Sequence, residues 1–140
     1  MATITIQRTA IRNILHAEST NASRTFLRND GVSDFEEIVI DKQADDSLNG
    51  AWNEACAKLR EKMHEFLTGS NINTSMAQFD FMATSTPDGL DENIKMYIVD
   101  YMMQDWLASV RPDFRQRYLD RCTTQMDDLL RKLYKKEPPV

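Results

Sequence analysis

The sequence predicts a mainly α-helical fold, a single small bundle of about four helices with a short extended segment near Phe79 and Phe81. Its 140 residues fit one domain, 1–140, whose core needs no covalent staple. Only four glycines and four prolines occur, and 41% of the residues are hydrophobic, which is typical of a globular chain. Several long segments space their apolar residues three and four positions apart, as amphipathic helices do.

The first helix is expected from about Thr9 to near Thr25. Ile4 and Ile6 alternate before it, and apolar residues at positions 11, 14 and 15 then follow a helical spacing. A run of Ser, Thr and Asn at 19–23 weakens this prediction, because short polar side chains compete for backbone groups.

An acidic loop is expected at about 29–46. This segment has seven acidic residues against one lysine, Lys42; the acidic residues are Asp30, Asp34, Glu36, Glu37, Asp41, Asp45 and Asp46. Ser33 and Glu36 have the spacing of a capping box and favour a helical turn, whereas the apolar residues 38–40 favour a short strand. Both alternatives stay open.

The clearest helix is predicted over residues 48–66, because one face is apolar at every turn. That face comprises Leu48, Trp52, Ala55, Leu59, Met63 and Phe66. Asp45, Asp46 or Ser47 can cap the start of this helix, and Gly69 can close its end in the left-handed conformation.

An extended segment follows, since Phe79 and Phe81 alternate with polar residues before the turn sequence at 86–89. It is expected to be a lone strand or one arm of a hairpin. The next helix, from Leu90 to Leu107, is apolar nearly all round, so it is either central in the bundle or shared with a neighbouring subunit.

The last helix begins near Pro112, which suits a first helical turn, and the segment 135–139 is expected to end it. Its apolar stripe is Leu119, Cys122, Met126, Leu129 and Leu133. We expect Trp52, Leu59 and Phe66 to face the same core as Leu119, Met126 and Leu133.

Charge and composition argue against several classes of protein. The net charge of -5 and the pI near 5.0 oppose nucleic acid as a principal partner, because duplex binding depends on Lys and Arg. No segment has the roughly 18 apolar residues of a membrane span. Cys56 and Cys122 lie in apolar helical patterns, so buried free thiols and a reducing cytoplasm are expected.

No catalytic or cofactor site is predicted. His16 and His64 are the only histidines and have no nearby ligand in sequence, so they are expected to be structural. The acidic loop lacks the ligand alternation of a calcium site, and the glycines are isolated, which gives no nucleotide-binding loop. The sequence therefore predicts a protein that is not an enzyme and binds no metal or cofactor.

Two features suggest interaction surfaces. Met96, Met102, Met103 and Trp106 share one helix, where they either fill the core or pack against a copy of the chain or another protein. Residues 111–137 carry eight basic against five acidic residues, which fits a salt-bridged helix or a head-to-tail contact with a neighbour's acidic loop. The candidate interface residues are Asp34, Glu36, Glu37, Asp41, Met96, Met103, Trp106, Arg131, Lys132, Lys135 and Lys136.

Five segments carry a resemblance to a known family. They are ITIQRTAI, DDSLNGAWNEACAKL, AQFDF, IKMYIVDYMMQDWL and LLRKLYKKEPP, in this order over most of the chain. In order and spacing they resemble short helical structural proteins of bacterial prophages. The arrangement is similar to that of head-tail adaptor proteins, which form a ring beneath the portal of a tailed phage.

The resemblance implies a ring-forming connector subunit without cofactor or active site. Its partners would be itself, the portal and tail-completion proteins, and its location the virion, with the host cytoplasm during assembly. The acidic loop and the extended segment depart from the adaptor pattern, so adaptor, stopper and tail-completion roles stay open. The alternative from the residues is a small cytosolic regulatory or adaptor domain that binds another protein through its Met-rich helix.

Overall fold

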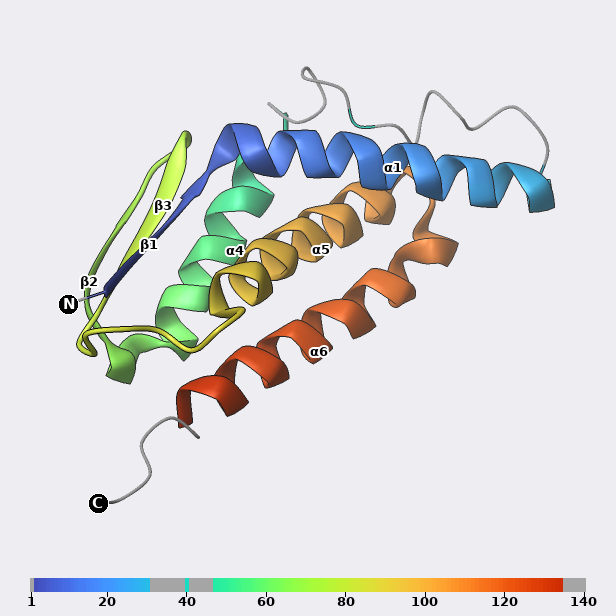
Figure 1. Cartoon of the computed structure of the whole chain (residues 1–140). Coiled ribbons are helices and arrows are strands. Elements are labelled where there is room, and N and C mark those ends of the chain that lie inside the picture. The colour runs from blue at the N-terminus through green and yellow to red at the C-terminus, as the bar shows by residue number, and fades with distance from the viewer. Residues whose placement is uncertain (1, 31–39, 41–46, 135–140) are drawn as a thin grey trace.

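A computed structural model describes residues 2–30, 40 and 47–134, and it places their side chains except at 22–30 and 110. In this part of the chain, four α-helices surround one core and a small antiparallel sheet lies at one end (Figure 1). The helices are α1 (Arg8–Asp30), α4 (Asn49–Lys62), α5 (Leu90–Val110) and α6 (Arg115–Tyr134). The predicted mainly α fold is confirmed.

The sheet contains three strands, β1 (Ala2–Gln7), β2 (Leu67–Ile72) and β3 (Met76–Phe81), in the order β1-β3-β2. The extended segment at Phe79 and Phe81 is thus confirmed as the central strand, with β2 as its hairpin partner. One face of the sheet is buried in the core, with Ile4 and Ile6 of β1 beside the two phenylalanines of β3.

A buried arginine ties this sheet to the helices. Arg8 is 3% exposed and donates hydrogen bonds from its guanidinium to Asn49 Oδ1 (2.9 Å) and to the Thr74 carbonyl (3.3 Å). It also lies 5.2 Å from the ring centroid of Trp52, whose indole N–H donates to the Asn73 carbonyl. The β1–α1 junction, the start of α4 and the β2–β3 turn are therefore held at one point.

Helix α1 is longer than predicted, running to Asp30 instead of ending near Thr25. The polar run does not break it, because Ser19 and Thr20 both donate back to the His16 carbonyl within the helix. Ile40 packs onto α1, and its N–H donates to Ser19 Oγ at 2.8 Å. The turn at Ser33 and most of the acidic loop lie outside the described residues.

Helix α4 is shorter than predicted. It ends at Lys62, and a 3-10 turn, η1 (His64–Phe66), leads directly into β2. Gly69 does not close a helix as expected but lies in β2, where the β2–β3 register shifts between Leu67 and Gly69. The predicted apolar face is nevertheless buried from Leu48 to Met63. Phe66, which lies beyond the end of the helix, packs against the same core.

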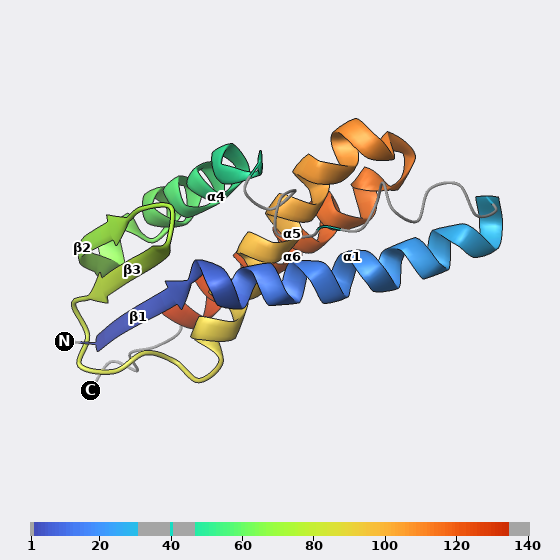
Figure 2. The same cartoon turned by 90° about the horizontal axis from the view of Figure 1, so that it is seen from above.

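Helix α5 occupies the centre, and α1, α4 and α6 all pack on it (Figures 1 and 2). This explains its nearly all-round apolar sequence. Gly89, with φ of 80°, precedes it in the left-handed region. Pro112 begins a 3-10 turn, η2 (Pro112–Phe114), just before α6, as its missing N–H favours.

Candidate interaction groove

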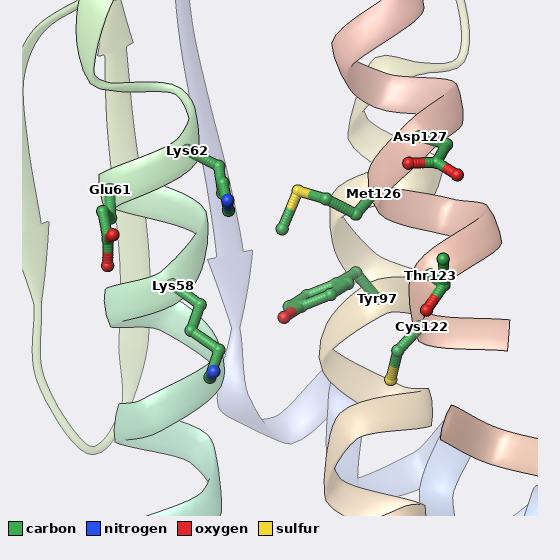
Figure 3. Close-up of a pocket in the computed structure, with 8 residues that line it drawn as sticks. All are labelled: Lys58, Glu61, Lys62, Tyr97, Cys122, Thr123, Met126 and Asp127. Carbon is green, nitrogen blue, oxygen red and sulfur yellow. The ribbon is translucent and has the colours of Figure 1, made fainter. Parts of the chain in front are cut away.

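Helices α4 and α6 both lie on α5, and a cavity of about 480 Å³ separates them. Figure 3 shows side chains from all three helices converging on it. We call it the α4–α6 groove; its lining residues are Lys58, Glu61, Lys62, Tyr97, Cys122, Thr123, Met126 and Asp127.

The apolar stripe of α6 divides at this groove. Cys122, Leu129 and Leu133 are buried in the core, and Tyr118 joins them, although the sequence pattern had not singled it out. Leu119, Met126 and Leu130 lie on the neighbouring flank and stay only partly buried. Of the predicted shared core, Trp52, Leu59 and Leu133 are buried together, and Phe66 and Met126 pack at its edge. Leu119 lies outside that buried cluster.

The floor of the groove is uncharged at neutral pH. Burial raises the pKa of Tyr97 to about 12, with nearby Cys122 as a smaller cause. Burial also raises the pKa of Cys122 to about 12, and Asp100 adds to that effect. Both groups therefore remain protonated and present an aromatic and a thiol surface.

The α4 wall is charged. Lys58 Nζ lies 5.9 Å from the ring centroid of Tyr101, and the Tyr101 hydroxyl donates to Glu54 Oε2 at 2.7 Å. Burial raises the pKa of Tyr101, and its bond to Glu54 raises it further. The exposed Glu61 and Lys62 complete this wall. The α6 side is mixed, because Cys122 and Met126 stand beside Thr123 and Asp127.

One end of the α4–α6 pair is bridged by Tyr134. Its ring packs edge-on against Phe66, with 5.0 Å between the centroids, and its hydroxyl donates to Glu65. Tyr134 is nonetheless 66% exposed. A smaller cavity of about 130 Å³ lies beside this bridge and is lined in part by Phe66, Met82 and Leu133.

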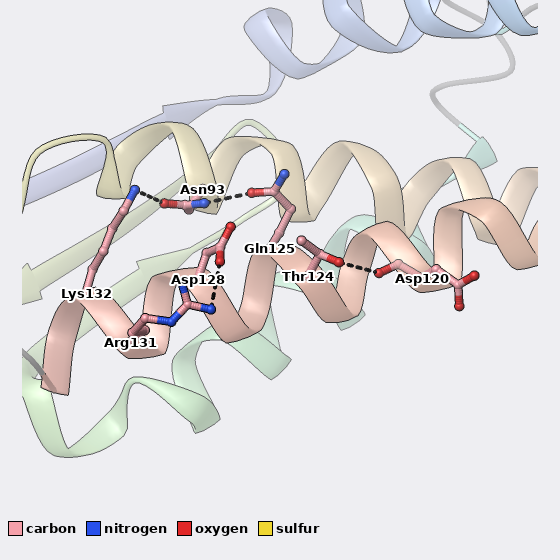
Figure 4. Close-up of polar contacts among 7 residues, drawn as sticks. All are labelled: Asn93, Asp120, Thr124, Gln125, Asp128, Arg131 and Lys132. Atoms are coloured by element: carbon pink, nitrogen blue, oxygen red, sulfur yellow. Dashed lines mark hydrogen bonds and ion pairs between the residues drawn. The ribbon is translucent and has the colours of Figure 1, made fainter.

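The other flank of α6 is joined to α5 by a polar chain (Figure 4). Asn93 donates to Gln125 Oε1 at 2.8 Å and accepts a short hydrogen bond from Lys132 Nζ. Arg131 pairs with Asp128 at 3.2 Å, one turn away. Two predicted interface cations, Lys132 and Arg131, thus already have partners within the chain.

The other predicted interface residues are unequally placed. Met96 and Trp106 are partly buried, but Met103 is 0% exposed and cannot itself touch a partner, which corrects its place among the candidates. It is buried because it lies on a face of α5 that the rest of the chain covers. Asp34, Glu36, Glu37, Asp41, Lys135 and Lys136 lie outside the described residues.

Helix α5 also contains a buried carboxyl group that sequence reasoning missed. Asp100 is 1% exposed, and its Oδ1 has no hydrogen-bond partner among the described residues. Its pKa is raised to about 7, chiefly by burial; Arg121 opposes this rise, and Glu18 contributes to it. The detectable signal was a single aspartate inside the apolar run 96–103.

The two cysteines and the two histidines lie in four different elements. Cys56 and Cys122 are buried free thiols, as expected. His16 Nδ1 lies 3.1 Å from the Ile40 carbonyl, and His64 is exposed in η1. Across residues 2–30, 40 and 47–134, no three His, Cys, Asp or Glu side chains are grouped to hold a metal ion. None of the helices described in this range could cross a membrane.

Comparison of the chain with protein-family models, characterised proteins and solved structures found no match.

Proposed function

We propose that this chain is a structural protein of a phage or prophage virion, a subunit of the oligomeric connector that links the portal to the tail. The observation that carries the proposal is the α4–α6 groove. A helix laid in this groove would contact α4, α5 and α6 at once and would cover the partly buried Met126 above the Tyr97 floor. Grooves between helices are a common way of binding an amphipathic helix of another chain.

In a ring of connector subunits, each subunit binds one neighbour through one surface and the other neighbour through a different surface. Such head-to-tail contacts close into a ring when the rotation permits. In this proposal the groove, with Lys58 and Lys62 on α4 and Met126 on α6, is one of the two surfaces, and a helix from elsewhere on the neighbour is the other. The five resembling segments supply the virion assignment, and the partners proposed are further copies, the portal and tail-completion proteins.

The alternative role, a regulatory domain that binds through the Met-rich helix, has less support. Met102 and Met103 are both 0% exposed, so this helix offers them to the core and not to a partner. Met96 and Trp106 alone would make a small surface.

The location of the chain tests the proposal. Tailed particles are purified from a host that carries the gene, and the chain is sought by mass spectrometry and by antibody labelling in the electron microscope. We expect label at the junction of head and tail, and tailless heads when the gene is deleted. Absence of the chain from tailed particles would refute the connector role.

The groove is tested with two variants of α6 that add the same charge. Met126→Glu places a carboxylate in the groove, whereas Thr124→Glu places one on the exposed side of the same helix. We expect only Met126→Glu to reduce incorporation into particles, with thermal unfolding confirming that both variants fold. Equal incorporation of the two would mean that neighbours bind elsewhere.

A further inference from the structure

Strand β1 is an outer strand of the sheet, on the side away from β2 (Figure 2). It pairs with β3 without a bulge from Ala2 to Gln7. The Arg8 N–H donates to the Ser75 carbonyl, which continues the β1–β3 register by one residue. Because hydrogen-bonded positions alternate along an antiparallel pair, the even-numbered residues of β1 point their N–H and C=O groups toward β3. The backbone groups of Thr3, Thr5 and Gln7 therefore point outward, along the edge of the sheet.

This edge is open. Within the ranges that the structure describes, the outward N–H and C=O groups of Thr3 and Thr5 and the N–H of Gln7 have no hydrogen-bond partner, whereas the Gln7 carbonyl directly precedes α1 and accepts its first helical bond. The three side chains are also exposed. An unpaired row of this kind is a template for another strand.

The strand also lacks the features that usually protect such an edge. Charged residues, proline and bulges prevent edge pairing in many proteins, and β1 has none of them in its sequence ATITIQ. The opposite edge differs, because β2 contains Gly69 and a register shift beside it. Of the two outer strands, β1 is therefore the one better suited to pair with a further strand.

We infer that β1 is a self-association edge, at which two copies of the chain pair antiparallel about a two-fold axis and share one continuous sheet. The contact goes beyond the proposed virion role, because it concerns the isolated chain in solution and lies on a different surface from the α4–α6 groove. A two-fold contact uses the same patch on both copies and stops at two.

A second copy fits this edge for reasons of charge and register. Two uncharged strands meet without like-charge repulsion. Residues with outward backbone groups must face one another, and a register centred on Thr5 sets Thr5 opposite Thr5 of the other copy and the Thr3 carbonyl opposite the Gln7 N–H. The same register sets Ile4 opposite Ile6, so the buried face of the sheet continues across the axis.

Analytical ultracentrifugation tests the association. The wild-type chain should shift from monomer to dimer as its concentration rises, and Thr5→Pro, which removes one outward N–H, should remain monomeric. Thr5→Val keeps that N–H and should still dimerise. A wild-type chain that stays monomeric at all concentrations would overturn the inference, as would a dimeric Thr5→Pro, and neither result would touch the connector proposal.

Cysteine cross-linking tests the register without disrupting the strand. Directly opposite residues in a hydrogen-bonded pair have Cα atoms about 5.5 Å apart, within the range of a disulfide. Under mild oxidation, Thr5→Cys should therefore form a covalent dimer, while Thr3→Cys and Gln7→Cys should each fail alone and cross-link when mixed. Failure of Thr5→Cys to cross-link, or efficient cross-linking of Thr3→Cys alone, would contradict this arrangement.

Discussion

Tyr118 and Glu18 join the last helix to the first: the Tyr118 hydroxyl donates a 3.0 Å hydrogen bond to Glu18 Oε1, although 100 positions separate the two residues. Arg121 donates to the same oxygen at 2.9 Å. Glu18 is thereby compensated by two donors of α6, whereas nearby Asp100 has an Oδ1 without a partner among the described residues. This unequal pairing makes Asp100 the group whose ionisation opposes folding.

Asp100→Asn should stabilise the protein above neutral pH. The folded-state pKa of Asp100 is raised to about 7, above the roughly 3.9 of an exposed aspartate. The folded state therefore binds the proton more tightly, and the contribution of this group to stability falls as pH rises from about 4 to about 7. Urea unfolding should show a gain on the order of 4 kcal/mol for the variant above pH 7, and little near pH 4.

The exposed Asp120→Asn is the control for that experiment, since it makes the same chemical change on the outside of α6. It should leave the pH dependence of unfolding as in the wild type. If Asp100→Asn shows the wild-type pH dependence as well, the buried carboxyl group is not the source of it.

Leu59→Ala should cost roughly 2 to 5 kcal/mol, because Leu59 is 0% exposed in the core and its truncation leaves a cavity. Leu130→Ala removes the same atoms from a partly buried position on α6 and should cost clearly less. Denaturant titration of both variants measures the difference. A loss under about 0.5 kcal/mol for Leu59→Ala would contradict its burial.

Assembly that depends on opposite charges should weaken as salt is added, because exposed pairs contribute only about 0.2 to 1 kcal/mol each and are screened. The acidic side is expected at Asp34, Glu36, Glu37 and Asp41. Lys132 holds Asn93 inside the chain, so its reversal would confuse folding with assembly. The better variant reverses Arg131, Lys135 and Lys136 to Glu.

This triple reversal should reduce incorporation into particles at little cost in thermal stability, because the Arg131–Asp128 pair that it breaks is exposed. Reversing the acidic set as well should partly restore incorporation. The single variant Lys132→Gln removes the positive charge but keeps a hydrogen-bond donor for Asn93. It therefore shows the effect of the charge without loss of the internal donor. Normal incorporation of the triple variant would show that these charges only solvate the surface.

Removal of metal should have no effect on stability. The two histidines lie in different elements, His16 in α1 and His64 in η1, and both cysteines are buried in the core. Exhaustive dialysis against a chelator should leave the thermal midpoint unchanged in differential scanning calorimetry. A lower midpoint that zinc or calcium restores would show a metal requirement.

The helices were predictable because their apolar periodicity is strong and local. The sheet was only partly predictable: Phe79 and Phe81 indicated a strand, but β1 has just Ile4 and Ile6 as its signal, and its partner lies far along the chain. The end of α4 was misplaced because Phe66 continues the helical spacing while already leading into β2. Periodicity cannot tell a helical turn from a turn that enters a strand.

The α4–α6 groove was not predictable for a different reason. The stripe on α6 looked like a single buried face, yet Met126 lines a space between α4 and α6, and Leu130 is only partly buried against the core. Only the packing angle of the helices, which depends on the whole core, decides which side of a stripe is covered. Asp100 likewise appeared as one polar residue in an apolar helix, and its burial depends on the positions of α1 and α6.

The pairing of β1 with β3 bears on how the chain is made. Ala2 is synthesised before its partner Phe81, which follows only after α1 and α4. Contacts so distant in sequence close slowly, because the intervening loop must first lose entropy. During synthesis, both sides of β1 are then available for misplaced strand pairing, which makes the emerging chain more prone to aggregate than the finished protein.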